Sequence, residues 1–385
     1  MYLCILNQHS IMIENPFVTN GYVGADYFCD RKKETQDIIQ LLSNGNNIAL
    51  ISPRRYGKTD LIRHCFDQEI IKNRYYTFII DIYSTKSLAE MVNKMGKMIL
   101  ESLKPQGRKV WEGFLNIVRS LKAGISYDMD GLPSLTMSVG DIVNPNNTLD
   151  EIFHYLNMAD KPCLVAIDEF QQILKYEDTN VEAALRTYVQ YCSNANFVFL
   201  GSQRHLMGAM FVSPNRPFYQ SVTVMNLQLI ELEKYWSFCE RHFLKAGKSI
   251  DKEVVEHLYT KFDGITFYLQ KVMNVLFMRT STGGHCHVED LQPAIDYIIS
   301  FTSQTYEDLL YQLPEKQRLV LVAICKEGKV GQITSGKFAK KYGLASPSAV
   351  KSAVNALLDR DLITHEKGVY AVYDKFLEIW MRESL

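Results

Sequence analysis

The sequence predicts an α/β protein in which a doubly wound, largely parallel sheet is followed by an all-helical segment and a winged helix-turn-helix unit. Three observations predict this order. Up to about residue 230, short apolar runs alternate with stretches of helical spacing, a pattern that places helices on both faces of a parallel sheet. Residues 231–305 carry only helical patterns. Residues 306–385 combine helical patterns with one two-stranded hairpin pattern.

The composition is that of a globular protein with two or three domains, since the 385 residues are 47% hydrophobic and 22% charged. The net charge of −1 gives the whole molecule no general attraction to a polyanion. No apolar run approaches the roughly 18 residues of a membrane span. The eight cysteines include no C-x-x-C pair, so we expect reduced thiols and a cytoplasmic location. Residues 1–13 are apolar but lack the features of a signal peptide, and we expect an extra strand or a loose arm there.

Five apolar runs of strand length define the expected sheet, and helical spacing recurs between them, as in residues 58–70, 87–103 and 181–193. The segment 104–148 interrupts this alternation, because its Gly, Pro, Asn and Asp content fits a helix followed by an irregular hairpin inserted into the sheet domain. The expected domains are therefore 1–230, 231–305 and 306–385. The expected strands are 46–52, 75–83, 163–170, 196–202 and 222–229.

The stretch "ISPRRYGKTDLI" (51–62) follows the first expected strand and fits seven of the eight positions of the phosphate-binding pattern G-x-x-x-x-G-K-[ST]. Gly57 would let backbone N–H groups approach phosphates, Lys58 would place a charge on the outer phosphates, and the Thr59 hydroxyl would ligate Mg²⁺. Only Ser52 departs from the pattern. A small residue is tolerated there unless the chain needs a positive φ, whose strain is on the order of 1 kcal/mol. The expected nucleotide-binding residues are Ser52, Pro53, Arg54, Arg55, Tyr56, Gly57, Lys58, Thr59, Asp60 and Asp168.

Two adjacent acids end the strand "LVAIDEF" (164–170), about 110 residues after the loop. Asp168 would hold the Mg²⁺ shell together with Thr59, and Glu169 would take the proton of an attacking water. The next expected strand ends in "LGSQRH" (200–205), where Ser202 or Gln203 would face the γ-phosphate or orient the water. An ordinary strand end is the alternative there, and both stay open. With Lys58, these side chains predict hydrolysis of a nucleoside triphosphate.

The tripeptide "HCH" (285–287) raises the question of a metal site. Residues this close in sequence rarely converge on one ion, and the surrounding "TGGHCH" fits a turn. The sequence therefore favours a turn over a metal site.

Residues 334–372 fit a winged helix-turn-helix, with Ser346 expected as the N-cap and Pro347 as the first residue of its second helix. The core stripe of this helix is expected at Val350, Val354, Leu357 and Leu358. Residues 314–385 carry 12 basic and 8 acidic side chains, and the basic ones near the helices would suit contacts with DNA phosphates. Because such units also dock proteins, duplex DNA and a protein partner both stay open. The basic residues in question are Lys337, Lys340, Lys341, Lys351 and Arg360.

These motifs resemble the archaeal-type ATPase family, which lies on the AAA+/STAND side of P-loop proteins and is also frequent in Bacteroidetes. The likeness extends over nearly the whole chain. "NPFVTNGYVGADYFCDRKKE" (15–34) resembles the family's N-terminal segment, and "PRRYGKTDL" (53–61) resembles its arginine-bearing loop. "GITFYLQKVMNVL" (264–276) is similar to its lid helix, and "VYDKFLEIWMR" (372–382) to its closing segment. Besides Ser52, the chain departs at Thr266, which stands where the family's lid proline contacts the base.

The resemblance implies ATP rather than GTP, a lid over the adenine, and an arginine supplied to the phosphates, usually by a neighbouring subunit. An oligomer is therefore an open possibility. Without such an arginine we expect slow intrinsic turnover, since it is worth roughly 10³–10⁵ in rate. Arg204 and Arg216 are the first candidates, although each also fits an ordinary salt-bridging residue. The other candidates are Arg54, Arg55 and Arg186.

The sequence as a whole favours an ATP-hydrolysing molecular switch whose ATP and ADP states differ in how the winged helix is presented. Two alternatives from other classes stay open. One is a DNA-binding regulator that senses ATP without appreciable hydrolysis, and the other is a partner-docking scaffold stabilised by bound nucleotide.

Overall fold

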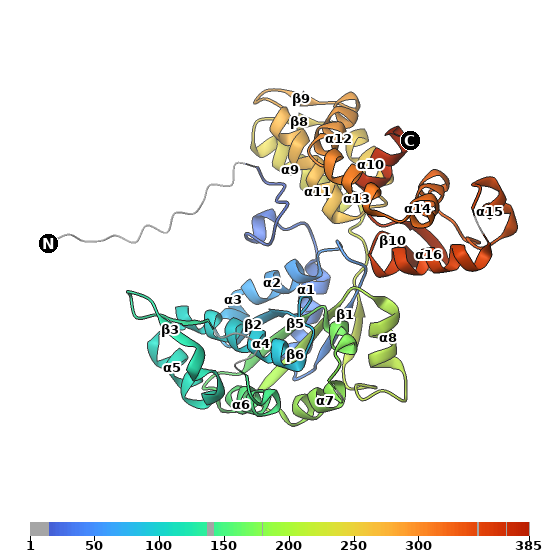
Figure 1. Cartoon of the computed structure of the whole chain (residues 1–385). Helices are drawn as coiled ribbons and strands as arrows, with labels where there is room; N and C mark the ends of the chain where they lie inside the picture. The colour runs from blue at the N-terminus through green and yellow to red at the C-terminus, as the bar shows by residue number, and fades with distance from the viewer. Residues whose placement is uncertain (1–14, 137–141, 179, 345, 367, 385) are drawn as a thin grey trace. The chain divides into compact units, whose positions relative to one another are not determined.

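The computed structural model describes residues 15–136, 142–178, 180–344, 346–366 and 368–384, so the predicted arm or strand at residues 1–13 lies outside the described residues. The chain forms two compact units (Figure 1). We call residues 20–235 the sheet unit, and residues 236–384 with residues 15–19 the C-terminal unit. Each cysteine of the described ranges is a buried free thiol. Across these same ranges, no helix combines the length and the hydropathy needed to cross a membrane.

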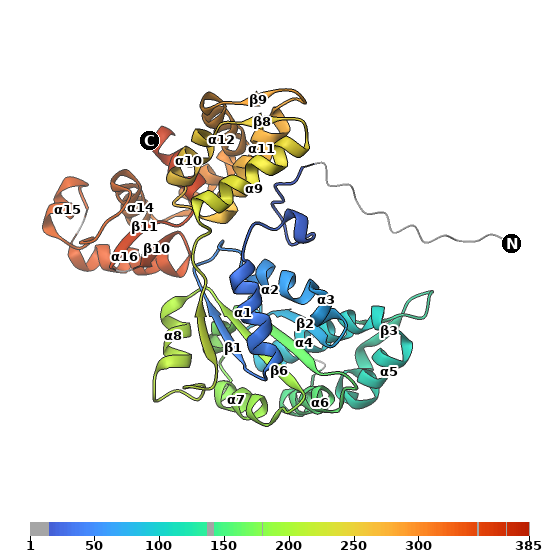
Figure 2. The same cartoon turned by 180° about the vertical axis from the view of Figure 1, so that it is seen from behind.

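The sheet unit is built on a parallel sheet with helices packed around it (Figures 1 and 2). The sheet has five strands in the order β2-β5-β6-β1-β7. The predicted parallel α/β sheet is thus confirmed. β6 lies between β1 and β5, so the segments that follow these three strands leave the sheet side by side at its carboxyl edge. The strands are β1 (Ile48–Ile51), β2 (Tyr76–Asp81), β5 (Cys163–Asp168), β6 (Ala195–Gly201) and β7 (Thr223–Asn226).

Alternation along the strands divides the core of the sheet unit into two layers. Ile48 and Leu50 of β1 pack on one face with α1 and α2, whereas Ala49 and Ile51 pack on the other face with α4 and α6. Burial on both faces explains why the strands read as continuous apolar runs. The helices of this unit are α1 (Lys32–Ser43), α2 (Lys58–Asp67), α3 (Glu69–Lys72), α4 (Leu88–Leu103), α5 (Arg108–Ile117), α6 (Pro145–Met158), α7 (Val181–Tyr191) and α8 (Arg204–Val212).

The inserted segment forms α5 and an antiparallel hairpin of β3 (Ile125–Tyr127) and β4 (Pro133–Leu135). Trp111 and Phe114 of α5 are buried in the same core layer as α4 and α6. The insertion is therefore anchored on the sheet unit through its helix.

The N-terminal motif Arg31–Glu34 ties the start of α1 to the end of the sheet. Arg31 is almost fully buried and has a positive φ of 66°. Its guanidinium donates to Glu34 at 2.7 Å and to the Gln228 carbonyl, just after β7, at 2.7 Å. These two motif residues thus have a structural role in the sheet unit.

In the C-terminal unit, the predicted helical segment is followed by a winged helix. The segment 15–17 belongs to this unit, because Asn15 Nδ2 donates to the Asn274 carbonyl and Asn274 Nδ2 donates to the Phe17 carbonyl, both at 2.8 Å. The helices are α9 (Leu232–Lys245), α10 (Lys252–Lys261), α11 (Thr266–Arg279), α12 (Leu291–Ser300), α13 (Ser303–Gln312), α14 (Glu315–Glu327), α15 (Gly336–Lys341), α16 (Pro347–Asp359) and α17 (Lys375–Ser384). The strands are β8 (Ser249–Ile250), β9 (His285–Cys286), β10 (Ile363–Glu366) and β11 (Val369–Val372).

The predicted winged helix is confirmed in most of its details. The Ser346 side chain caps α16 by accepting from the Ala349 N–H, and β10 pairs with β11 as the wing. One core residue was wrong, since Leu358 is only half-buried while Ala353 is buried. Neighbouring residues of a helix differ by about 100° in direction, so Leu357 takes the inward place and Leu358 cannot share it.

Candidate nucleotide site

The loop 52–57 connects β1 to α2 and is closed by the side chain of Lys58. Lys58 is 6% exposed, and its Nζ donates to the Ser52 carbonyl at 2.9 Å and to the Pro53 carbonyl at 3.1 Å. The loop carbonyls thus hold the deeply buried ammonium group. The loop thus has the shape and the charge of a phosphate cradle.

The backbone of the loop shows why serine is accepted in place of the first glycine. Ser52 is fully buried and its N–H donates to the Gly201 carbonyl at 3.3 Å, but its φ is not positive. The left-handed positions are instead Arg55, with φ 70°, and Gly57, with φ 84°. The strain considered for Ser52 therefore does not arise, and it falls on Arg55 instead, at about 1–2 kcal/mol.

The Thr59 hydroxyl and the Asp168 carboxylate meet at the edge of the sheet. Thr59 is the second residue of α2, after Lys58, and its Oγ1 donates to Asp168 Oδ2 at 2.5 Å. Two hard oxygens this close are what Mg²⁺ takes from a protein when it binds through one or two side chains and the substrate phosphates. The residues present therefore fit the metal.

Glu169, the next residue, is held in a defined position. Its φ of 55° turns the chain sharply after β5. Glu169 Oε2 accepts from Ser202 Oγ at 2.7 Å and from Gln171 Nε2. Ser202 follows β6, so two neighbouring strands bring the acid and the serine together. Gln171 did not emerge from the sequence, and its only signal is its place two residues after Glu169.

Burial controls the charges at this site. Desolvation is the largest effect on Lys58 and lowers its pKa, although Glu169 and Asp168 act in the opposite direction. Desolvation also raises the pKa of Asp168, against the hydrogen bond from Thr59. The pKa of Asp60, in the first turn of α2, is likewise raised by burial. The folded chain thus keeps charged groups in an environment that disfavours charge.

The candidate arginines differ in their surroundings. Arg54 Nε lies 3.9 Å from Glu169 Oε1, and its guanidinium lies over the ring of Tyr83. Arg204 begins α8, two residues after Ser202, and its charge adds to burial in lowering the pKa of Lys58. Arg216 pairs with Glu182 on α7. Of the two first candidates, Arg216 thus has the salt bridge that was its alternative.

The remaining predicted residues surround the same loop or its neighbours. Tyr56 packs partly buried against the core layer of α1 and α2. Gln203 is the N-cap residue of α8, although its side chain makes no capping hydrogen bond. Tyr56 thus packs against the core next to the loop, and Gln203 lies at the start of α8.

The helix with the lid motif, α11, begins at Thr266, in the N1 position where a proline would also be accommodated. Tyr268, two residues later, is fully buried. Its hydroxyl donates to the Tyr373 carbonyl at 3.2 Å and accepts from the Lys375 N–H at 3.0 Å. Tyr268 therefore joins the lid motif to the closing motif within the C-terminal unit.

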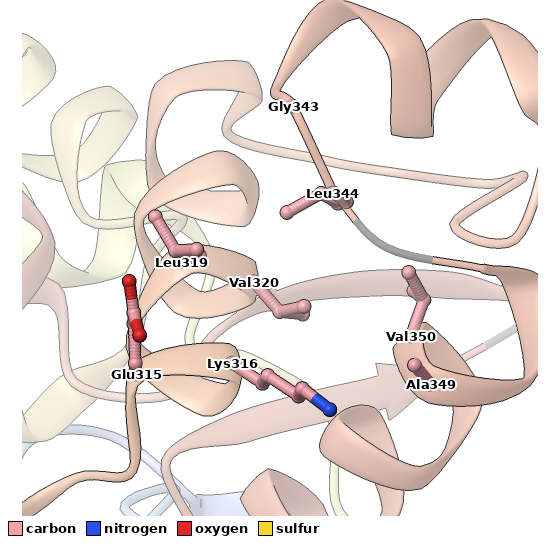
Figure 3. Close-up of a pocket in the computed structure, with 8 residues that line it drawn as sticks. All are labelled: Glu315, Lys316, Leu319, Val320, Gly343, Leu344, Ala349 and Val350. Atoms are coloured by element: carbon pink, nitrogen blue, oxygen red, sulfur yellow. The ribbon is translucent and has the colours of Figure 1, made fainter.

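The winged helix presents its predicted basic residues at the surface. Lys337, Lys340, Lys351 and Arg360 are exposed, and the exposed Lys341 forms an ion pair with Glu327, to which its Nζ donates at 2.5 Å. A pocket of about 260 Å³ lies between α14, the turn at Gly343 and α16, with apolar walls and Glu315 and Lys316 at one side (Figure 3). The exposed polar residues in the first half of α16 are Ser348, Lys351, Ser352 and Asn355, and the acidic Asp359 is exposed at its end.

The strand order and the loop after β1 define the fold of a P-loop ATPase. A Walker-type ATPase of Pyrococcus abyssi shares this fold with a TM-score of 0.64 and 15% identity, over 95% of this chain and 99% of that chain. The ORC1 protein of Aeropyrum pernix, solved in complex with DNA, shares it with a TM-score of 0.56 and 12% identity, over 96% and 97% of the two chains. At these identities the likeness concerns the fold.

Residues 28–272 match the family described as ATPase domain predominantly from Archaea, and residues 304–383 match a probable winged helix domain. The chain belongs to this ATPase family. An uncharacterized ATP-binding protein of Methanocaldococcus jannaschii is 21% identical over 205 residues. That match covers 51% of this chain and 55% of the relative, so the chain spans about half the length of this curated protein.

Proposed function

We propose that the chain binds ATP with Mg²⁺ at the loop 52–59 and hydrolyses it. The observation that carries this proposal is the buried Lys58 ammonium, held over the loop carbonyls, next to the pair of Thr59 and Asp168. Lys58 would bind the outer phosphates, and the N–H groups around Gly57 would bind the inner ones. Mg²⁺, held by Thr59 and Asp168, would neutralise charge that develops on the phosphate oxygens.

Glu169 is the proposed general base. Ser202 and Gln171 hold one of its carboxylate oxygens, which fixes the direction in which the other could accept a proton from water. Arg204, whose charge acts at Lys58, would contact the phosphates within the same chain. When nucleotide binds, the Arg54 guanidinium would leave Glu169 and contact a phosphate instead. Slow turnover remains expected unless a partner supplies a further arginine.

The ATP and ADP states would differ in how the winged helix is presented to its target. The exposed polar residues of α16, with Lys340 and Lys351, support duplex DNA as its target, and a protein partner is the competing outcome. The alternative function is a regulator that senses ATP without appreciable hydrolysis. It would bind ATP at the same loop and would differ from an ATPase only in its rate of turnover.

The test is phosphate release by the purified chain with ATP and Mg²⁺, compared with Glu169→Gln. We expect measurable turnover in the wild type, and a loss of at least about 10²-fold in the variant with ATP affinity retained. Turnover that persists in Glu169→Gln would show that another group is the base. Binding without turnover in the wild type would favour the sensor.

A further inference from the structure

Two short parallel strands in the C-terminal unit bring together side chains from two segments of the chain that are distant in sequence. Strands β8 and β9 pair in the register Ser249 with His285 and Ile250 with Cys286. The Asp251 N–H continues this pairing by donating to the Cys286 carbonyl at 3.1 Å. Asp251 is thereby placed beside the tripeptide 285–287.

The extended backbone explains how residues so close in sequence can converge. Side chains alternate along a strand, so His285 and His287 share one face while Cys286 points to the other and is fully buried. The turn expected from the sequence precedes this strand, at residues 282–283. The sequence predicts a turn here and not a strand. In a strand, side chains two residues apart point the same way, so the two imidazoles share a direction.

The donor atoms of the three side chains lie close together. Asp251 Oδ1 is 2.7 Å from His285 Nε2, and Asp251 Oδ2 is 3.1 Å from His287 Nδ1. All three ligand atoms lie within 4.8 Å of one another. Two tetrahedral ligands of zinc at about 2.1 Å from the ion are roughly 3.4 Å apart. Small side-chain movements would therefore seat an ion among them.

Asp251 occupies the N-cap position of α10, yet its side chain does not cap the helix. An aspartate in that place usually accepts from the N–H groups of the first turn, a bond worth about 1 kcal/mol. Here both carboxylate oxygens are directed to the imidazoles instead. Helix capping thus does not account for the position of Asp251, whereas the His287 side chain also accepts from the Asp290 N–H and caps the 3₁₀ helix Val288–Asp290.

We propose that Asp251, His285 and His287 form a site for a divalent transition metal ion, with zinc as the first candidate. Two imidazole nitrogens and one carboxylate favour zinc, cobalt, nickel or copper over magnesium and calcium, which take oxygen ligands. The Ser249 hydroxyl lies 2.6 Å from His285 Nδ1 and would fix that ring with Nε2 toward the ion. The side chains are 37–59% exposed, so water would complete the coordination.

Zinc would link residue 251 to residues 285–287 within the C-terminal unit. Ions that bind only the folded chain stabilise it by mass action, so thermal unfolding should report the site independently of ATP. We expect one zinc ion per chain to bind by calorimetry after treatment with a chelator. We also expect zinc to raise the midpoint of unfolding of the wild type.

The test compares His285→Gln, His287→Gln and Asp251→Asn with a matched control. Each should weaken zinc binding at least about tenfold and remove the zinc-dependent rise in the unfolding midpoint. The control is His257→Gln, which changes an exposed histidine of α10 that contacts only its own helix carbonyl in the described contacts. Circular dichroism and ATP affinity verify that the variants fold. Equal zinc binding by the double variant His285→Gln/His287→Gln, or no binding by the wild type, would overturn the proposal.

Discussion

The Thr59 hydroxyl donates to the Asp168 carboxylate at 2.5 Å, although the two residues are 109 positions apart in sequence. The strand order explains the contact, because β1 and β5 both border β6 and end at the same edge of the sheet. The fold thus brings the loop and the acid together. The charge of Asp168, buried at this contact, has consequences for stability.

Asp168→Asn should stabilise the nucleotide-free chain at neutral pH. Burial raises the pKa of Asp168, so the folded state binds its proton more tightly than the unfolded chain does. The resulting contribution favours folding below the unfolded pKa of about 4 and is lost as the pH rises through the raised folded value. We expect a higher melting temperature at pH 7.5, by roughly 2–4 °C if the effect is about 1 kcal/mol, and little change at pH 4.5.

Thermal unfolding at the two pH values, without nucleotide, measures this effect. The same variant should lose Mg²⁺-dependent ATP binding, because Asp168 is a proposed metal ligand. A lower melting temperature at pH 7.5 would mean that the hydrogen bond from Thr59 outweighs the burial of the carboxylate.

Ser202→Ala should slow hydrolysis with little effect on binding. The Ser202 hydroxyl holds Glu169 Oε2 at 2.7 Å, and without it the proposed base gains freedom. We expect kcat to fall about tenfold while the affinity for ATP stays within about twofold. Steady-state phosphate release measures the first value and calorimetry the second. Ser221→Ala is the matched control, since its hydroxyl bonds only to the nearby Phe218 carbonyl among the contacts described here. Unchanged kcat in Ser202→Ala would remove Ser202 from the catalytic set.

Tyr268→Phe should reduce stability and leave ATP affinity unchanged. The buried hydroxyl connects the Tyr373 carbonyl and the Lys375 N–H, and its removal leaves the carbonyl and the N–H without this partner, at a cost of about 1–3 kcal/mol. Chemical denaturation measures the stability, and titration with Mg-ATP measures the affinity. A large loss of affinity at normal stability would instead place Tyr268 against the nucleotide.

Lys340→Gln with Lys351→Gln should weaken binding to duplex DNA and flatten its salt dependence. Each phosphate contact that is lost lowers the salt slope by about 1. Lys341→Gln is the comparison variant and should cost less, because Lys341 Nζ already donates to Glu327 and is less available for a direct phosphate contact. Fluorescence anisotropy with a labelled duplex, at salt concentrations of about 50 and about 200 mM, measures the affinity and its salt dependence. Absence of DNA binding by the wild type at low salt would contradict this prediction and favour a protein as the partner of the winged helix.

The sheet and the phosphate loop were predictable because their signals are local. A buried parallel strand reads as an apolar run, and Gly57, Lys58 and Thr59 are consecutive. The hydrogen-bond partners of Glu169 were harder to predict from the sequence. The sequence offers Ser202 as a residue facing the γ-phosphate or the attacking water, or as an ordinary strand end, but its bond to Glu169 depends on β5 and β6 being neighbours. Gln171 carried no recognisable pattern.

Three further findings depended on three-dimensional placement. Tyr268 belongs to a motif that resembles a lid, but its buried hydroxyl joins two helices of the C-terminal unit. Lys341 counts as a basic residue in the sequence and forms an ion pair with Glu327 in the structure. His285 and His287 were assigned to a turn, because the pairing that brings Asp251 to them spans 34 residues and has no signature in the sequence.

The most direct measurement of the central claim is a calorimetric titration of the purified chain with Mg-ATP, beside Lys58→Met. Methionine fills the space of the buried lysine stem without its charge, so the variant should fold and fail to hold the phosphates. The account predicts saturable heat with one ATP per wild-type chain and a loss of at least about tenfold in affinity for the variant. Absence of heat in the wild type, or equal affinity in Lys58→Met, would contradict it.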